Sequence, residues 1–129
     1  MSLNKYSIEV TEEQMRLIAD CLEDVSRFAA GQCEMKWSIG EMIKDVPFDE
    51  KMEKRKGAEA VLEQAKRILL PELSTHESKG YDGTDFIGNT YQIYRTILHK
   101  LAIEHNWDNV YSSPPLKSGT MGTVKITKL

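Results

Sequence analysis

The sequence contains few cysteines and no cysteine motif. Cys21 and Cys33 are the two thiols, and neither belongs to a CxxC pair or to a histidine cluster. This pattern argues against zinc-finger and thioredoxin-like sites. The two residues are 12 positions apart, which on one helix is about 18 Å and too far for a disulfide. We therefore expect two reduced thiols, packed as small hydrophobic side chains in a reducing compartment.

Long apolar runs are also lacking. No stretch approaches the roughly 20 apolar residues that a membrane-spanning helix needs, and the first residues have neither the basic nor the apolar region of a signal peptide. The hydrophobic content of 40% and the charged content of 29% are typical of soluble globular proteins. We expect a cytoplasmic protein without membrane contact.

The sequence has no recognisable catalytic or cofactor motif. GxSxG, Walker A and GxGxxG patterns do not occur, which argues against the common hydrolase and nucleotide-binding sites. His99 and His105 are six positions apart, so on a helix they would point about 120° apart, whereas the zinc-protease pattern needs i, i+4. We expect no catalytic residue, no metal and no cofactor. An enzyme whose site is assembled only by folding is the third hypothesis for function.

Charge is distributed unevenly but mildly. The net charge is −3; residues 1–65 carry 9 basic and 14 acidic groups (−5), and residues 66–129 carry 8 and 6 (+2). Such an imbalance does not by itself indicate a nucleic-acid or membrane surface.

The densest basic run provides the nucleic-acid hypothesis. It comprises Lys51, Lys54, Arg55 and Lys56, with acidic residues interleaved that cancel most of its field. A nucleic-acid-associated accessory protein is the second hypothesis for function. It predicts that this run merges with Lys66, Arg67 and Arg95 into one basic face.

The longest amphipathic segment covers residues 11–37. A step of about 100° per residue places its apolar side chains in one stripe: Ile18, Ala19, Leu22, Val25, Ala29, Cys33 and Trp37. Thr11 and Gln14 have the spacing of a capping box. Gly31 costs about 1 kcal/mol inside a helix. We predict one continuous helix over about 12–37, with a break at Gly31 as the alternative.

Two further helices are predicted. The first covers about 57–70 and ends before Pro71, because a residue before proline disfavours helical geometry. The second covers about 85–105, with an apolar stripe and an opposite polar side. The stripes are Val61, Leu62, Ala65, Ile68 and Leu69 in the first helix, and Ile87, Tyr91, Tyr94, Leu98, Leu101 and His105 in the second; the polar side carries Gln92, Arg95, Thr96 and His99.

Two short terminal segments have the alternation of strands. Apolar and polar residues alternate over about 5–10 and again over 122–128. Antiparallel pairing would hold both chain ends in place. The predicted fold class is therefore α+β, mainly α: a three-helix core with a small antiparallel two-stranded sheet formed by the N- and C-terminal strands, all in a single domain over residues 1–129.

An aromatic and proline-rich connector over 106–120 is the candidate contact surface. Exposed tyrosine and tryptophan often anchor protein interfaces, so we assign protein contact to Trp107, Tyr111, Pro114 and Pro115. Core packing is the competing interpretation for these aromatics. Tyr91 and Tyr94 lie on an apolar stripe, and we expect them in the core with their hydroxyls at the rim.

Several segments together resemble small uncharacterised proteins encoded by phages and prophages. The resemblance lies in IEVTEEQ, in SRFAAGQCE with its Gly31–Glu34 element, in YQIYRTILHKL and in VYSSPPL, and it covers about residues 8–116. It implies a phage-derived gene, a bacterial cytoplasm and a small protein that acts through binding. It transfers no catalytic or binding residue.

The leading hypothesis for function is a non-enzymatic interaction or accessory protein. The long first segment has more apolar positions than the shorter second helix can cover. We therefore expect a homodimer that also binds an unknown protein.

Overall fold

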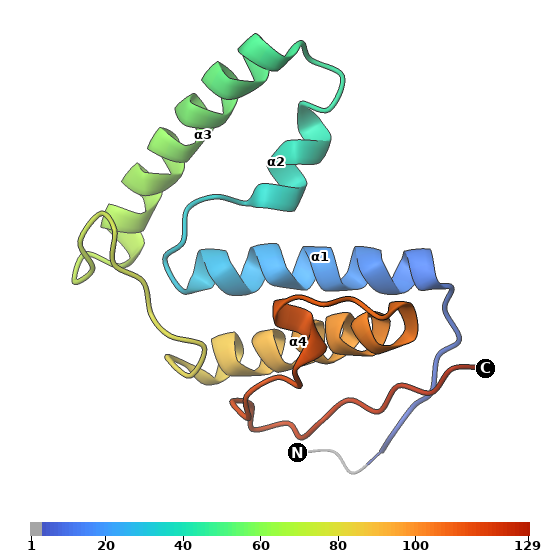
Figure 1. Ribbon diagram of the computed structural model, residues 1–129. Coiled ribbons are helices and arrows are strands. Elements are labelled where there is room, and N and C mark those ends of the chain that lie inside the picture. The colour runs from blue at the N-terminus through green and yellow to red at the C-terminus, as the bar shows by residue number, and fades with distance from the viewer. Residues whose placement is uncertain (1–3) are drawn as a thin grey trace.

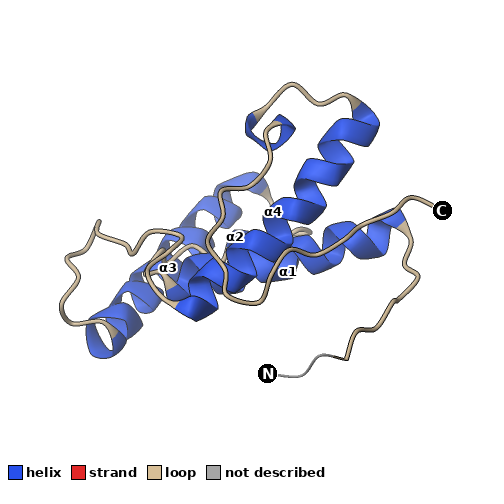
Figure 2. Ribbon diagram, turned by 90° about the horizontal axis from the view of Figure 1, so that it is seen from below, coloured by secondary structure: helices blue, strands red, loops and turns tan. Residues whose placement is uncertain are grey.

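The computed structural model describes residues 4–129, and this range is helical with no strand (Figures 1 and 2). Its elements are α1 (Glu12–Ala29), α2 (Lys36–Met42), α3 (Phe48–Leu69), α4 (Asp85–His105) and the 3₁₀ helix η1 (Val110–Ser112). The mainly helical character that was predicted is confirmed. The α+β class is wrong, because the two-stranded sheet does not form.

Helix α1 begins at the predicted cap. The Thr11 hydroxyl accepts a hydrogen bond from the Gln14 amide at 3.1 Å, and the Gln14 side chain accepts one from the Thr11 amide at 2.8 Å. These two bonds provide acceptors for amides at the start of the helix that have none within it. Glu12 and Glu13 add negative charge in the first turn, where the helix dipole favours it.

The continuous helix predicted to residue 37 is wrong, and the alternative break at Gly31 is correct. Helix α1 ends at Ala29, and Gly31 has φ +95°, which is readily adopted only by glycine. A β-carbon on Gly31 would lie 3.1 Å from Leu73 Cδ1. The chain therefore turns here, and α2 starts after Met35, itself at φ +43°.

Helices α1 and α4 form an antiparallel pair that contains the core. His105 Nε2 lies 2.6 Å from Glu12 Oε1 at one end, and the Ser26 hydroxyl donates to the Ile87 carbonyl at the other. Burial raises the pKa of Tyr94 to about 12. The predicted bounds of α4 are confirmed. The core cluster comprises Ala19, Tyr94, Ile97, Leu98 and Leu101.

The polar side of α4 faces a C-terminal strap, defined as residues 107–126, instead of solvent. Asn89 Oδ1 accepts from the Thr120 amide at 2.7 Å and Gln92 Oε1 from the Gly119 amide at 2.9 Å. Arg95 Nη2 donates to the Val110 carbonyl, and His99 Nδ1 lies 3.0 Å from the Tyr111 carbonyl oxygen. These side chains satisfy main-chain groups of the strap that a sheet would otherwise satisfy.

These contacts explain why the terminal segments do not pair. Ile126 packs against the core, and Val124 is half-buried. In the N-terminal segment, Tyr6 and Ile8 remain exposed. An isolated two-stranded ribbon is marginal in water, and here the C-terminal segment lies along α4.

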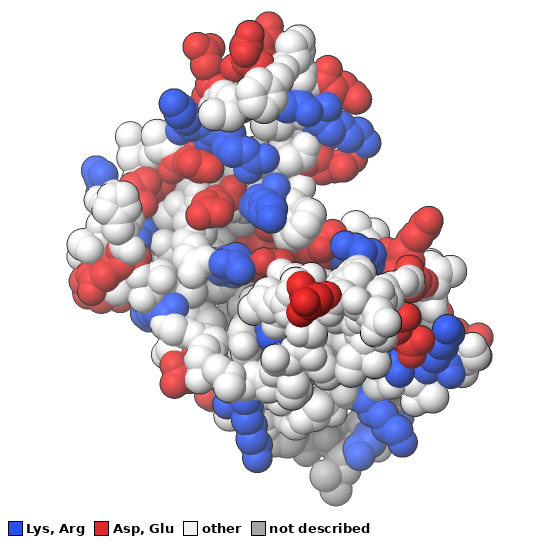
Figure 3. Space-filling view, in the orientation of Figure 1, with Lys and Arg blue, Asp and Glu red and all other residues white. Residues whose placement is uncertain are grey.

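Helices α2 and α3 form an arm, residues 36–69, that projects away from the α1–α4 body (Figure 1). Helix α3 begins at Phe48 instead of about 57, so it includes the charge run 51–56, and Asp49 and Glu50 lie in its first turn. A notch separates arm and body on the face drawn in Figure 3. Helix α4 has ten buried residues and α3 has one, Lys66, so the arm has little core of its own.

Candidate protein-contact surfaces

Acidic residues of α1 fix the start of the arm. Asp24, which is 2% exposed, accepts the amides of Trp37 at 3.0 Å and Ser38 at 2.7 Å. These are first-turn amides of α2, where a carboxylate is favoured. Glu23 accepts from the Trp37 indole at 3.2 Å and pairs with Arg27 at 2.8 Å. The carboxylates of Asp24 and Glu23 therefore lie on the side of α1 that faces α2.

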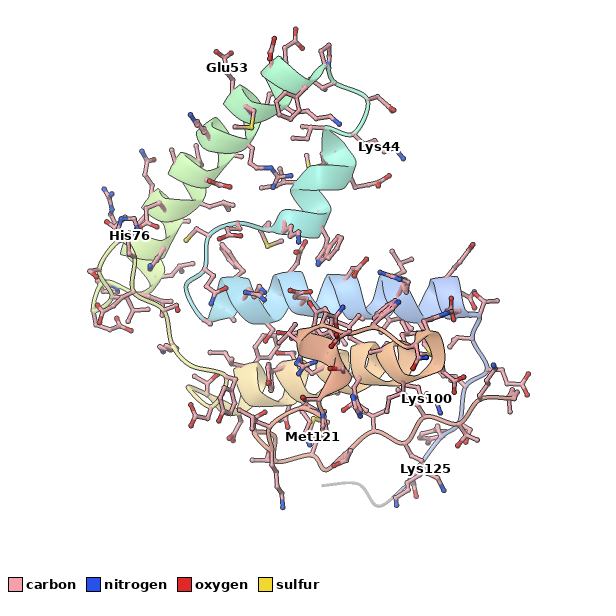
Figure 4. The ribbon with its side chains drawn as sticks, viewed as in Figure 1. Lys44, Glu53, His76, Lys100, Met121 and Lys125 are labelled. Atoms are coloured by element: carbon pink, nitrogen blue, oxygen red, sulfur yellow. The ribbon has the colours of Figure 1, made fainter. Side chains whose placement is uncertain are left out.

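A buried lysine fixes the other end of the arm. Lys66 Nζ donates to the carbonyl oxygens of Thr75 at 3.1 Å and Glu77 at 2.5 Å. The Lys79 amide in turn donates to the Ala30 carbonyl. The cation thus holds the loop after α3 against the end of α1, at the base of the arm where Figure 4 places His76.

The arm presents apolar side chains to solvent. Val61 is 63% exposed, Ile68 80% and Leu69 65%. These three residues, called the arm stripe below, have i, i+7, i+8 spacing and share one face of α3. Met42 and Phe48 are also exposed, farther along the arm.

The arm stripe was predicted as core and is missing from the predicted contact residues. Its periodicity is correct, because Val61, Ile68 and Leu69 do form one face. Periodicity identifies an apolar face but does not identify what covers it. The local sequence carries no signal that distinguishes this stripe from a core stripe.

A second apolar surface lies on α1. Leu17 is 64% exposed, Val25 42% and Ile18 36%, and Cys21 is exposed among them. We call these four residues the α1 outer face. The sequence placed Ile18 and Val25 on the apolar stripe and predicted that Cys21 packs as a small hydrophobic side chain. Both cysteines are free thiols, but the expected packing of Cys21 is wrong.

The total surface is large for the size of the chain. It amounts to 9394 Å², whereas a compact monomer of 14.7 kDa exposes about 6,900 Å². The projecting arm and the exposed terminal segments make the molecule extended, and this shape increases its surface area (Figure 1).

The four predicted contact residues occupy different environments. Trp107 packs against the core, with the Arg16 guanidinium 5.1 Å from its ring centre and His105 stacked on it. Tyr111 also packs against the core, with Arg95 5.0 Å from its ring centre. Pro114 is exposed and Pro115 half-buried. The two aromatic rings thus attach the strap to the body.

The seven basic residues named for nucleic acid do not all reach the surface. Lys54 and Lys56 are exposed on α3, and Lys51 and Arg55 are half-buried. Lys66 and Arg95 are buried, and both donate to carbonyl oxygens. Lys66 and Arg95 therefore cannot contact phosphates together with the basic residues of α3.

Two small clefts lie beside the C-terminal end of α1. One, of about 280 Å³, includes Cys33, Glu63, Lys66 and His76, and one carboxylate oxygen of Glu63 is buried without a hydrogen bond. Burial raises the pKa of the Cys33 thiol. A smaller fraction of this cysteine is therefore thiolate, which is the nucleophilic form.

The other cleft, of about 180 Å³, lies between Arg27, Tyr81 and Tyr91. Within residues 4–129, no three His, Cys, Asp or Glu side chains gather as metal ligands.

Comparisons with protein-family models, curated proteins and solved structures gave no match to this chain. Among the helices of the described range, none combines the length and the apolar character required to cross a bilayer.

Proposed function

We propose that this chain is a non-enzymatic interaction protein of phage or prophage origin, which acts in the bacterial cytoplasm as a homodimer and binds another protein through the α2–α3 arm. The observation that supports this most directly is the arm stripe. Three large aliphatic side chains lie exposed on α3, and the arm is held to the body by Asp24 at the start of α2 and by Lys66 near the end of α3.

Burial of the arm stripe would supply binding energy. Burying a valine, leucine or isoleucine fully contributes roughly 1.5–3 kcal/mol, so Val61, Ile68 and Leu69 could anchor a partner together. Gln64 lies beside the stripe and is exposed, which places a polar side chain at the rim of the apolar centre. The partner that fits is a protein with an aliphatic groove or an amphipathic helix.

A photo-crosslinking experiment tests the arm. The photoreactive residue benzoylphenylalanine replaces Ile68 in the full chain, which is irradiated inside bacteria that carry its gene, and the products are separated by mass. Arg67, exposed and about 100° around the helix from Ile68, provides the matched control position. We expect a discrete protein adduct from position 68 and none from position 67.

The composition of that adduct identifies the partner. An adduct with another protein supports the proposed function, and Val61→Glu should reduce its yield at least tenfold. Adduct formation at neither position, with the variant soluble and helical, overturns the arm as a binding surface. Equal labelling at both positions, which would indicate random collision, also counts against it.

A further inference from the structure

The smaller of the two clefts lies where the C-terminal end of α1 meets the first half of α4 and the loop before it (Figure 1). We call it the tyrosine cleft, because Tyr81, Tyr91 and Tyr94 line it. The rings of Tyr81 and Tyr91 stack with their centres 5.0 Å apart, and the Tyr94 ring lies nearly perpendicular to Tyr91 at 5.6 Å. The three rings therefore hold one another in place and form an aromatic wall.

Two cations border this aromatic wall. The side chain of Lys79 is half-buried, and it forms no ion pair or hydrogen bond with another residue of the 4–129 range. The Lys79 backbone is fixed, because its amide donates to the Ala30 carbonyl at 2.7 Å. Arg27 is the second cation, and it is paired with Glu23 at 2.8 Å. Lys79 therefore carries the charge of the cleft that has no counter-ion.

Neutral groups add further hydrogen-bond donors. Tyr94 is 5% exposed and lines the cleft, and its hydroxyl has no hydrogen-bond partner within residues 4–129. Because burial raises the pKa of Tyr94 to about 12, the phenol keeps its proton at neutral pH and remains a donor. The Gln32 side-chain oxygen accepts from Arg27 Nη1 at 2.8 Å, which leaves the Gln32 amide nitrogen as a donor. A buried hydroxyl without a partner is costly, so an acceptor in the cleft would be favoured.

Negative charge is missing from the lining. Among the described residues, no aspartate or glutamate lines this cleft. Both carboxylate oxygens of Glu23, the partner of Arg27, already accept hydrogen bonds, one from Arg27 and one from the Trp37 indole. The volume of about 180 Å³ is close to the roughly 150 Å³ of a cavity that holds one benzene ring. The cleft therefore fits one aromatic ring with one anionic group.

We propose that the tyrosine cleft binds a single-ring aromatic carboxylate, with the ring on the tyrosine wall and the carboxylate directed at Lys79 and the Tyr94 hydroxyl. The cleft belongs to the α1–α4 body and the loop before α4, whereas the arm stripe lies on α3. This ligand is therefore additional to the protein contact of the proposed function. A free aromatic acid and the C-terminal phenylalanine of a protein both present a ring and a carboxylate.

Titration of the ¹⁵N-labelled full chain with benzoate, followed by amide chemical shifts, tests the cleft. We expect saturable shifts at residues 30–32, 79–81 and 91–94, with a dissociation constant of about 1 mM, as is typical of a small ligand. Benzamide has the same ring without the charge, and it should bind roughly tenfold more weakly. Cyclohexanecarboxylate keeps the charge without the aromatic ring and should also bind more weakly.

Two pairs of variants locate the ligand. Lys79→Gln should weaken benzoate binding roughly tenfold, because it removes a charged donor, and Lys54→Gln, the same change at an exposed position of α3, should leave it unchanged. Tyr94→Phe removes only the unpartnered hydroxyl and should weaken binding about fivefold. Its control is Tyr6→Phe in the exposed N-terminal segment, which should have no effect. Circular dichroism verifies that all four variants stay helical.

The outcomes decide the site and the source of the ligand. Absence of saturable shifts up to about 20 mM benzoate, equal binding of benzamide, or equal effects of Lys79→Gln and Lys54→Gln overturns the proposal. Weaker binding of N-acetylphenylalanine than of benzoate supports a free acid as the ligand, and tighter binding supports a protein C-terminus in the same cleft. The photo-adduct from position 68 is measured without any of these ligands. Failure of the cleft and failure of the arm are therefore distinguishable.

Discussion

Individual charged residues decide where the arm leaves the body. Asp24 receives two amides of α2, and Lys66 donates to two carbonyl groups of the loop after α3. Both are almost fully buried, and a buried charge is tolerated only when it is paired or well hydrogen-bonded. Each therefore holds the arm to the body at a specific point.

Asp24→Ala should destabilise the protein by about 2 kcal/mol, because it removes a helix cap and leaves two amides without an acceptor. Urea unfolding followed by circular dichroism measures the change. Glu13→Ala removes an exposed carboxylate from the same helix and should change the unfolding free energy by less than about 0.5 kcal/mol. Equal effects of the two substitutions would show that Asp24 does not cap α2.

At the scale of elements, one glycine separates α1 from α2. Gly31 combines φ +95° with close neighbours, since a β-carbon there would approach Leu73 and the Lys66 side chain. Gly57 lies inside α3 with no atom within 4 Å of the same position. The two glycines thus have opposite roles: one is required by the backbone, and the other only weakens a helix.

Alanine substitutions distinguish these roles. Gly31→Ala should lower the free energy of unfolding by about 1–2 kcal/mol, through left-handed strain and crowding. Gly57→Ala should raise it by up to about 1 kcal/mol, through better helix propensity. Thermal or urea unfolding of both variants measures the pair. A stabilising Gly31→Ala would contradict the break and favour a continuous first helix.

At the scale of the whole molecule, body and arm differ in burial. Ten residues of α4 are buried against α1 and the strap, whereas α3 buries only Lys66. Local opening is easier where few apolar contacts must be broken. The chain should therefore behave as a stable body with a less stable arm.

Hydrogen exchange measures this difference. In the purified protein, amides in the middle of α3 should exchange at least tenfold faster than those in the middle of α4. The exposed stripe gives α3 little protection until a partner covers it. Equal protection of α3 and α4 would mean that the arm is already covered, and would contradict an arm that is free in the purified protein.

Much of the fold was predictable from local sequence. The capping box at Thr11, the bounds of α4 and the free thiols are confirmed, because each follows from nearby residues and from chain geometry. The candidate contact surfaces were harder to predict from the sequence. The arm stripe and the α1 outer face have the same periodicity as core faces, so periodicity alone assigned them to the core.

The sequence by itself determined where α1 begins, both bounds of α4 and which faces of the helices are apolar, since capping residues and side-chain spacing within a segment set these features. Only the tertiary structure decided the partners of those faces. Asn89, Gln92 and Arg95 bind the strap and replace the predicted sheet. Gly31 turns the chain out of α1 and Asp24 fixes the start of α2, and the arm that follows has little core of its own. Contacts between residues distant in the chain depend on all competing arrangements at once, and a local pattern does not encode that competition.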